Sequence, residues 1–191
     1  MLGKKAKILT DTQISQLLSY VSSRRHPLRN RVILLLSVRA GLRAGEIAKL
    51  TWPMVLDPSG AVGPVIELRD HAAKKKSGRL IPLHADLRAA LSHLRATTTA
   101  AGPVVRSERG GPMTPVSIVN WFALVFQALG FDGCSSHSGR RTFITRAARM
   151  VHKAGGSLRD VQLLAGHRSI AVTQGYIDGD SDAQRRLVAL I

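Results

Sequence analysis

Two segments in the last third of the 191-residue chain combine side chains that can bind phosphate and move protons. In the first, HSGRRT at residues 137–142, His137 and Arg140 lie three residues apart at an expected helix start. A helix start favours anions through its free amides and its dipole, and a guanidinium can bind two phosphate oxygens at once. In the second, His167 lies at an expected helix junction, nine residues before Tyr176. These residue types and spacings indicate chemistry on a phosphate group.

Each of these residues taken alone also has a purely structural explanation. A His-x-x-Arg pair is commonly a solvated surface pair, and a lone tyrosine in a basic protein commonly packs half-buried. Arg43 can pair with Glu46 on its own helix, because residues three apart are neighbours on a helix surface. Lysines at a hairpin tip commonly only increase solubility. The functional argument therefore needs the whole set of residues.

The charge of the chain points to nucleic acid. It has 28 Lys and Arg against 12 Asp and Glu, a formal net charge of +16. A domain this basic attracts polyanions, with nucleic acid as the first partner to consider and an anionic membrane surface as the second. Aromatic residues make up 4% of the chain, fewer than proteins that stack single-stranded bases usually have. We therefore expect duplex DNA bound through its phosphates.

The composition excludes several other classes of protein. No apolar stretch is long enough to span a bilayer, and no apolar segment of a secretory signal follows the first residues. The single cysteine, Cys134, excludes an internal disulfide and a cysteine-rich zinc site, and it fits a reducing cytoplasm. The length favours one domain, or one domain with a short appendage.

Periodicity and capping signals predict a mostly helical chain with one small sheet. Thr10 and Gln13 form a capping box before the first helix. Further helices are expected near residues 28–40, 43–50, 86–95, 114–129, 140–152, 158–165 and 169–174. Two short strands, 65–68 and 79–82, flank a hairpin tip at 75–78. The predicted fold class is α+β, predominantly α-helical, with one small antiparallel β-sheet.

Four ordered blocks of this chain resemble blocks of the tyrosine recombinase family, also called the lambda-integrase or phage integrase family. AGLRAGEI at residues 40–47 resembles the family's first arginine block. Lys74, five residues before Arg79, resembles its hairpin lysine block. HSGRRTF at residues 137–143 resembles its His-x-x-Arg block, and LAGH at residues 164–167, followed by Tyr176, resembles its final block. The resemblance runs from about Ile8 to the C-terminus and implies the DNA breaking-rejoining enzyme fold.

The resemblance implies a site-specific DNA recombinase or integrase that cleaves and rejoins strands by transesterification through a 3′-phosphotyrosyl intermediate. Tyr176 would be the nucleophile, and Arg43 and Arg140 would bind the non-bridging phosphate oxygens. His167 would donate a further hydrogen bond to the phosphate, since preorganised donors are usually the largest catalytic term. His137 would act as a base or a phosphate contact. The bond energy is kept in the tyrosyl link, so no cofactor, metal or ATP is expected.

The resemblance gives Lys74 as the acid that protonates the leaving 5′ oxygen. Lys75 and Lys76 are adjacent, and a one-residue slip of the hairpin would exchange the three lysines. Glu46 is expected to orient Arg43 or its helix without contacting DNA. Further candidates for contacts to DNA phosphates are Lys75, Lys76, Arg79 and Arg141. Gly139 stands where the family often has an apolar residue, which bears on packing and not on the chemistry.

The expected organisation is a single catalytic domain over residues 1–191. The N-terminal core-binding domain of larger family members is expected to be absent, either because the chain is trimmed or because the recombinase is naturally short. Residues 181–191 form a candidate C-terminal docking helix, with folding back onto its own core as an equal alternative.

The expected partners are double-stranded DNA and further copies of the chain, assembled as a tetramer on paired sites of a mobile element or genome. No membrane and no small-molecule substrate are expected, and the expected location is the bacterial or phage-type cytoplasm, at the nucleoid. Two alternatives remain, namely type IB topoisomerase-like relaxation and an inactive DNA-binding regulator with the same fold. Formation of Holliday junctions would favour recombination. The target DNA sequence, and the choice among integration, excision, inversion and dimer resolution, stay open.

Overall fold

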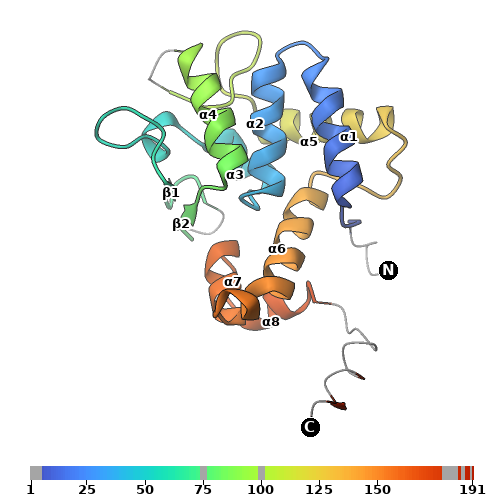
Figure 1. Cartoon of the computed structure of the whole chain (residues 1–191). Helices are drawn as coiled ribbons and strands as arrows, with labels where there is room; N and C mark the ends of the chain where they lie inside the picture. Colours follow the sequence, from blue (N-terminus) through green and yellow to red (C-terminus); the bar gives the residue numbers. More distant parts are fainter. Residues whose placement is uncertain (1–5, 74–76, 99–101, 178–184, 186–187, 190) are drawn as a thin grey trace.

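The computed structural model describes residues 6–73, 77–98, 102–177, 185, 188, 189 and 191. Within these residues the chain is predominantly helical with one two-stranded antiparallel sheet, which confirms the predicted fold class (Figure 1). The α-helices are α1 (Asp11–Ser22), α2 (Pro27–Val38), α3 (Ala44–Lys49), α4 (Ala85–Ala96), α5 (Pro115–Ala128), α6 (Ser138–Met150), α7 (Leu158–Ala165) and α8 (Ile170–Gln174), and the 3-10 helices are η1 (Trp52–Met54) and η2 (Val151–Ala154). No helix of the described part is both long and apolar enough to cross a bilayer.

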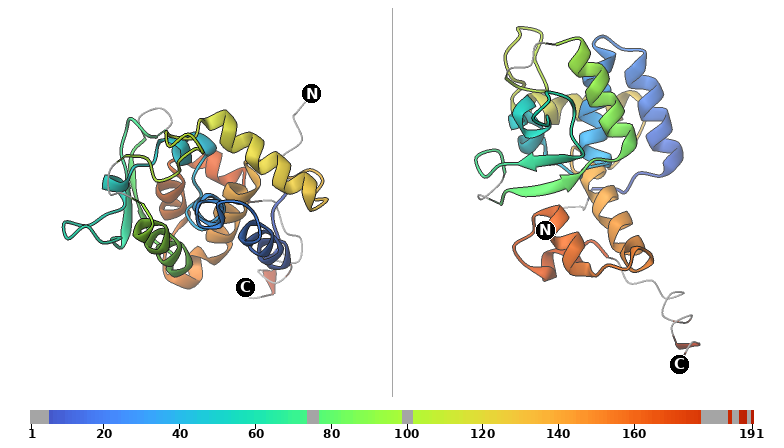
Figure 2. Two further views of the ribbon diagram at one scale, coloured as in Figure 1. Left: turned by 90° about the horizontal axis from the view of Figure 1, so that it is seen from above. Right: turned by 60° about the vertical axis from the view of Figure 1, so that its left-hand side comes forward.

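Helix α2 forms the centre of the fold. Every residue from Val32 to Val38 is buried, as expected for a helix that is apolar on most sides. It packs against α1, α4 and α6, and the view along its axis places it in the middle of these helices (Figure 2). The helix ends at Val38, and Gly41, where φ is +63°, then turns the chain towards α3.

The capping signals of the sequence mark real helix starts. The hydroxyl of Thr10 accepts from the amide of Gln13 (3.1 Å), and the Gln13 side chain accepts from the amide of Thr10 (3.0 Å). At α5 the hydroxyl of Thr114 accepts from the amide of Ser117 (3.0 Å). These bonds satisfy amides that a helix start leaves without partners, so local sequence sets the helix boundaries here.

The small sheet consists of β1 (Val65–Leu68) and β2 (Arg79–Pro82), at the predicted positions. Val65 pairs with Pro82 and Leu68 with Arg79 in an antiparallel register. Residues 74–76, at the predicted hairpin tip, lie outside the described residues. Helix α7 packs against β2, so the sheet lies between the main helical body and the C-terminal helices (Figure 2).

The apolar residues form two clusters of unequal size. The larger one is built by α1 to α5, η1 and the sheet. The smaller one lies among α6, η2 and α7, and its buried members are Ile144, Ala148, Val151, Val161 and Ala165. Helix α6 runs from the larger cluster into the smaller one (Figure 1). The relative placement of the two clusters therefore depends strongly on how α6 meets α2.

Gly139 allows α6 to approach α2 closely. A Cβ atom at this position would lie 2.9 Å from the Cβ of Ser37 and 3.0 Å from a methyl group of Val38, and closer still to the hydroxyl of Ser37. Both neighbours, Ser37 and Val38, are buried in helix α2. The departure from the family's apolar residue thus matches a tight contact between two helix backbones.

We expect Gly139→Ala to destabilise the fold by about 1 to 3 kcal/mol, because the added methyl group overpacks the contact between α2 and α6. The measurement is the free energy of unfolding in denaturant. Gly45→Ala in α3 is the matched control, because a Cβ there meets nothing within 4 Å. It should stabilise the helix by roughly 0.5 to 1 kcal/mol. Equal stability of Gly139→Ala and wild type would contradict this account of the contact.

Candidate active site

An open pocket of about 470 Å³ gathers residues from three distant segments of the chain. Arg43 comes from the start of α3, His137 and Arg140 come from the start of α6, and Tyr176 follows α8. The rest of the wall consists of Ala6, Ser135, Arg141, Ala171, Val172 and Gly175. Four of the six residues predicted to be catalytic thus line one pocket.

Arg140 is fixed at the buried side of this pocket, with 2% of its surface exposed. Its Nη1 donates to the carbonyl oxygen of Gly41, and its Nη2 donates to the carbonyl oxygen of Ala165 (2.7 Å). Burial lowers the pKa of Arg140 to about 10, and the nearby Arg43 adds to this. The guanidinium therefore keeps its positive charge at neutral pH and holds it in one place.

Two arginines cap the C-terminal end of α7. The carbonyl of Leu164 accepts from Nε of Arg79 (2.8 Å), and the next carbonyl, that of Ala165, accepts from Arg140. The last carbonyls of a helix have no partners within the helix, and the helix dipole favours cations there. Gly166, with φ +62°, ends the helix immediately afterwards. The chain then enters the loop that carries His167.

His167 is buried and neutral, with 9% of its surface exposed. Burial and the charge of Arg140, followed by Arg43 and Arg79, lower its pKa to about 4. Its Nε2 lies 3.0 Å from Nη2 of Arg140, and its Nδ1 lies 2.9 Å from the hydroxyl of Thr173. Because arginine has only donors, Nε2 must accept, and Nδ1 carries the proton.

This arrangement bears on one expectation from the sequence, which stays a prediction for the DNA-bound state. His167 was expected to donate a hydrogen bond to the phosphate, yet its accepting nitrogen faces Arg140 and its protonated nitrogen faces Thr173. Its carbonyl oxygen also accepts from Nε2 of Gln162 (2.9 Å). In this structure His167 orients the guanidinium of Arg140, because both of its ring nitrogens are used inside the protein.

Tyr176 packs its ring against His167, with centroids 5.3 Å apart and planes 24° apart. The hydroxyl of Thr145, on α6, donates to the carbonyl oxygen of Tyr176 (3.1 Å), and the amide of Tyr176 donates to the carbonyl of Thr173 (3.1 Å). Within the described residues the phenol oxygen has no hydrogen-bond partner. The backbone of Tyr176 is thus anchored, while its hydroxyl stays available to a group in the pocket.

Glu46 balances two arginines next to the pocket. Its carboxylate, 1% exposed, accepts from Nη1 and the amide of Arg43 (2.8 and 3.0 Å) and from Nη1 and Nη2 of Arg79 (both 3.1 Å). Burial raises the pKa of Glu46, but the hydrogen bonds and charge of Arg79 and Arg43 outweigh it and lower the pKa to about 2. Glu46 is therefore ionised and holds Arg43, as the sequence predicted.

Arg79 corrects a second expectation. It was expected at the protein surface as a phosphate contact, but its side chain is 6% exposed and its nitrogens donate to Leu164 and Glu46. A Cβ on Gly166 would lie 2.8 Å from its Nη1, so the guanidinium passes directly over this glycine. The structure gives Arg79 a role inside the protein, because its donors are already used there.

The remaining predicted site residues divide into two groups. His137 is exposed at the edge of the pocket, and the partly buried Arg141 lines the same pocket, so both stay candidates for contact with a phosphate. The three lysines at 74, 75 and 76 lie outside the described residues. Among those that are described, no three His, Cys, Asp or Glu side chains gather as metal ligands.

Several contributors to the site could not be found from the sequence. Thr145 and Thr173 are ordinary helix residues until the fold places them against Tyr176 and His167. The acceptors on Gly41 and Ala165 are backbone carbonyls, which exist at every residue. Only Gly41 had a signal, as a glycine after a helix. A Cβ on it would also collide with the ring of Phe143.

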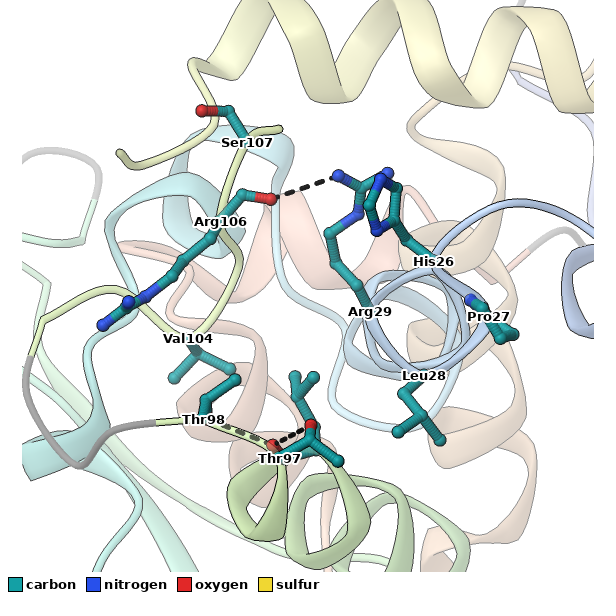
Figure 3. Close-up of a pocket in the computed structure, with 10 residues that line it drawn as sticks. His26, Pro27, Leu28, Arg29, Thr97, Thr98, Val104, Arg106 and Ser107 are labelled. Carbon is teal, nitrogen blue, oxygen red and sulfur yellow. Dashed lines mark hydrogen bonds between the residues drawn. The ribbon is translucent and has the colours of Figure 1, made fainter. Parts of the chain in front are cut away.

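A second hollow, of about 340 Å³, lies at the opposite end of α2 from Gly41 (Figure 3). Its lining comes from the start of α2, the end of α4 and the segment 104–107. There Arg29 donates to the carbonyl oxygen of Arg106 (3.2 Å). The hollow contains none of the predicted catalytic residues, so the candidate site is the pocket around Arg140.

The comparison with protein families and curated sequences gives a consistent result. The profile of the Phage integrase family matches residues 7–182. Tyrosine recombinase XerC of Brucella suis is 30% identical over 158 residues, which cover 80% of this chain and 47% of that protein. The XerC of Rhizobium meliloti is 32% identical over 158 residues, covering 80% and 46%. The chain therefore spans about half the length of the curated relatives it matches.

Solved structures share the fold. The integrase of the Tn1549 transposon, in complex with a circular intermediate DNA, superposes with a TM-score of 0.77 at 20% identity, covering 100% of this chain and 67% of that one. XerA recombinase gives 0.75 at 22% identity, covering 96% and 64%. A lambda integrase dimer bound to a core site gives 0.69 at 20% identity, covering 92% and 49%.

Nitrogen NMR can test the state of His167. We expect the ring to be neutral at pH 7 with its proton on Nδ1, and to titrate near pH 4. Its folded-state pKa lies below the ordinary value of 6.5. The neutral ring therefore contributes stability above pH 6.5, and this contribution is lost as the pH falls towards 4. His167→Gln should remove that part of the pH dependence of unfolding. A charged ring at pH 7, or a proton on Nε2, would contradict the assigned contacts.

Proposed function

Because the chain belongs to the phage integrase family of tyrosine recombinases, we propose that it breaks and rejoins duplex DNA at specific sites through Tyr176. The observation that carries this proposal is the pocket that gathers Arg43, His137, Arg140 and Tyr176 in one protomer. The basic character of the chain, with a net charge of +16, supports DNA as the substrate. The relatives named tyrosine recombinase support the same reaction.

The proposed reaction is two transesterifications. The phenol oxygen of Tyr176 attacks the scissile phosphorus, a tyrosyl–phosphorus bond forms, and the bond from phosphorus to the 5′ oxygen breaks. The 5′ oxygen takes up a proton as it leaves. In the second step the 5′ hydroxyl of another strand attacks the 3′-phosphotyrosyl link and releases Tyr176. Each step exchanges one phosphoester bond for another, so the exchange needs no outside energy source.

The arginines would stabilise the charge that builds on the phosphate. Arg43 uses one guanidinium nitrogen on Glu46, and within the described residues its Nε and Nη2 have no protein partner. These donors are therefore available to a non-bridging oxygen. Arg140 supplies a fixed charge at the buried side of the pocket. Charges held in place before the reaction are the most effective kind, because nothing has to reorganise.

His137 and Tyr176 would complete the site. His137 lies at the exposed edge of the pocket, where an imidazole can accept the phenol proton or contact the phosphate. The cations of Arg43 and Arg140 would favour the phenolate in the bound complex. The stacking of Tyr176 on His167 restricts its ring. Because all these groups belong to one chain, each protomer would cleave DNA with its own tyrosine.

The proposed partners are double-stranded DNA and further copies of the chain, assembled as a tetramer on paired sites. The DNA complexes of the Tn1549 integrase and the lambda integrase dimer support DNA binding by this fold. We also propose that the protein acts at the nucleoid in the bacterial cytoplasm, and that residues 181–191, most of which lie outside the described residues, dock between protomers. We further propose, as the sequence suggested, that residues 1–191 form a single catalytic domain.

The first test uses a nicked DNA site that traps the covalent adduct. Wild type should form an adduct, and Tyr176→Phe should form none, because phenylalanine keeps the ring against His167 but lacks the attacking oxygen. DNA affinity should change by less than about fivefold, since one hydroxyl without a protein partner contributes about 1 kcal/mol at most. An adduct that survives Tyr176→Phe would contradict the proposed nucleophile.

The same preparation separates recombination from its alternatives. Holliday junctions formed between two target sites favour a recombinase, whereas relaxation of supercoils without junctions favours a topoisomerase. DNA binding without any adduct in wild type would identify an inactive regulator and overturn the proposal.

The second test asks which lysine is the acid. Lys74→Met should slow cleavage of ordinary DNA by about 10² to 10⁴-fold, the usual contribution of general acid catalysis. A substrate with sulfur in the 5′ bridging position should be cut by this variant at nearly the wild-type rate, because a thiolate leaves without a proton. Lys75→Met and Lys76→Met are the matched controls. If the sulfur substrate restores cleavage by Lys75→Met or Lys76→Met, and not by Lys74→Met, that other lysine is the acid.

A further inference from the structure

The charges of three side chains next to the pocket do not sum to zero. Arg43 and Arg79 carry two positive charges and share one carboxylate, that of Glu46. Buried charges of this kind are costly unless they are paired and hydrogen-bonded. One uncompensated positive charge therefore remains, and it lies on the side of Arg43, whose side chain is 21% exposed and lines the pocket. Arg79 does not line that pocket.

We propose that Arg79 is a positioning residue that keeps Arg43 available to the DNA phosphate. Arg79 binds both oxygens of Glu46, so that Arg43 reaches this carboxylate through a single guanidinium nitrogen. The inference rests on the proposed function, since it concerns the same phosphate site. It assigns Arg79 no contact with DNA.

The hydrogen bonds at Glu46 support this division of roles. Arg79 approaches side by side, with Nη1 on Oε1 and Nη2 on Oε2, both at 3.1 Å. Arg43 contributes Nη1 on Oε1 (2.8 Å), and the second oxygen receives its backbone amide (3.0 Å). Each carboxylate oxygen therefore already has two donors. There is little room left for a second guanidinium bond from Arg43.

Removal of Arg79 would change the pairing of Arg43. An arginine and a carboxylate prefer two parallel hydrogen bonds, and Arg43 lies only three residues from Glu46 on the same helix start. With Arg79 gone, Glu46 would have Arg43 as its only ion-pair partner. The pair would then be neutral, and its two-point geometry would use the donors that are available in the wild type.

Arg79 can act in this way because it is anchored independently of Glu46. Its Nε donates to the carbonyl of Leu164 at the end of α7, and its guanidinium passes over Gly166, where a Cβ would come within 2.8 Å. The residue itself pairs with Leu68 in the sheet. Strand β2 and helix α7 thus hold the guanidinium in place while Glu46 and Arg43 meet it from α3.

The test measures single-turnover cleavage at saturating DNA, together with DNA affinity and thermal stability. Arg79→Met should slow cleavage by about 10² to 10³-fold, the usual loss when one preorganised donor is removed. DNA affinity should stay within about threefold, because the side chain of Arg79 is 6% exposed and donates to Leu164 and Glu46, so its removal costs no phosphate contact. Arg88→Met is the matched control, since Arg88 also binds a backbone carbonyl, that of Val62 (3.1 Å), far from the pocket.

The decisive variant adds Glu46→Gln to Arg79→Met. A neutral amide no longer holds Arg43 as an ion pair, so the double variant should cleave at least about tenfold faster than Arg79→Met, which recovers about one third to one half of the expected loss on a logarithmic scale. A merely structural role for Arg79 predicts the opposite, because the double variant loses still more of the network. A double variant as slow as Arg79→Met, with both folded, overturns the inference.

Two further results separate the role of Arg79 from the proposed function. If Arg79→Met does not fold, Arg79→Lys and Arg79→Lys/Glu46→Gln replace it, because lysine keeps the charge but cannot bind both oxygens side by side. The double variant should again be the faster one, and the reverse order overturns the inference. A wild type that forms no adduct overturns the proposed function and the role of Arg79 with it. An active wild type without recovery in the double variant overturns the role of Arg79 alone.

Discussion

The capping of α7 by two arginines is the interaction on which the rest of the site depends. Arg79 and Arg140 donate to two consecutive carbonyls at the end of this helix. Both arginines also bind the segment around α3, Arg79 through Glu46 and Arg140 through Gly41. These bonds join the part of the chain that carries the larger apolar cluster to the helix α7 of the smaller one. The pocket exists because the two parts are held at this distance.

The bonds of these arginines concentrate positive charge next to the pocket. Arg43, Arg79 and Arg140 surround a single carboxylate, and the same charges, after burial, keep His167 neutral. Such an arrangement costs stability in the free protein, since like charges repel and their burial removes part of their hydration. A phosphate in the pocket would supply the missing negative charge. The free protein is thus organised for an anion that it does not itself provide, a common feature of sites that stabilise developing charge.

The contacts of His167 and Arg79 inside the protein have a common cause. His167 and Arg79 were expected to face the phosphate because their residue types suit it, yet both donate or accept inside the protein. A sequence pattern reports the type and the spacing of a side chain, but its direction depends on neighbours that are distant in the chain. Arg79 meets Glu46, 33 residues away, and Arg140 meets His167, 27 residues away. These contacts depend on tertiary packing, and no local sequence pattern predicts them.

The sequence by itself determined the helix starts at Thr10 and Thr114, the strand positions and four of the residues that line the pocket. Capping at Thr10 and Thr114 depends on contacts three residues apart, and the two strands pair within one hairpin of the chain. Only the tertiary structure decided which of the charged residues face the pocket and which hold it together. The physical reason is burial, because an arginine in the interior must use its donors on the nearest acceptors, whereas one at the surface keeps them for a ligand.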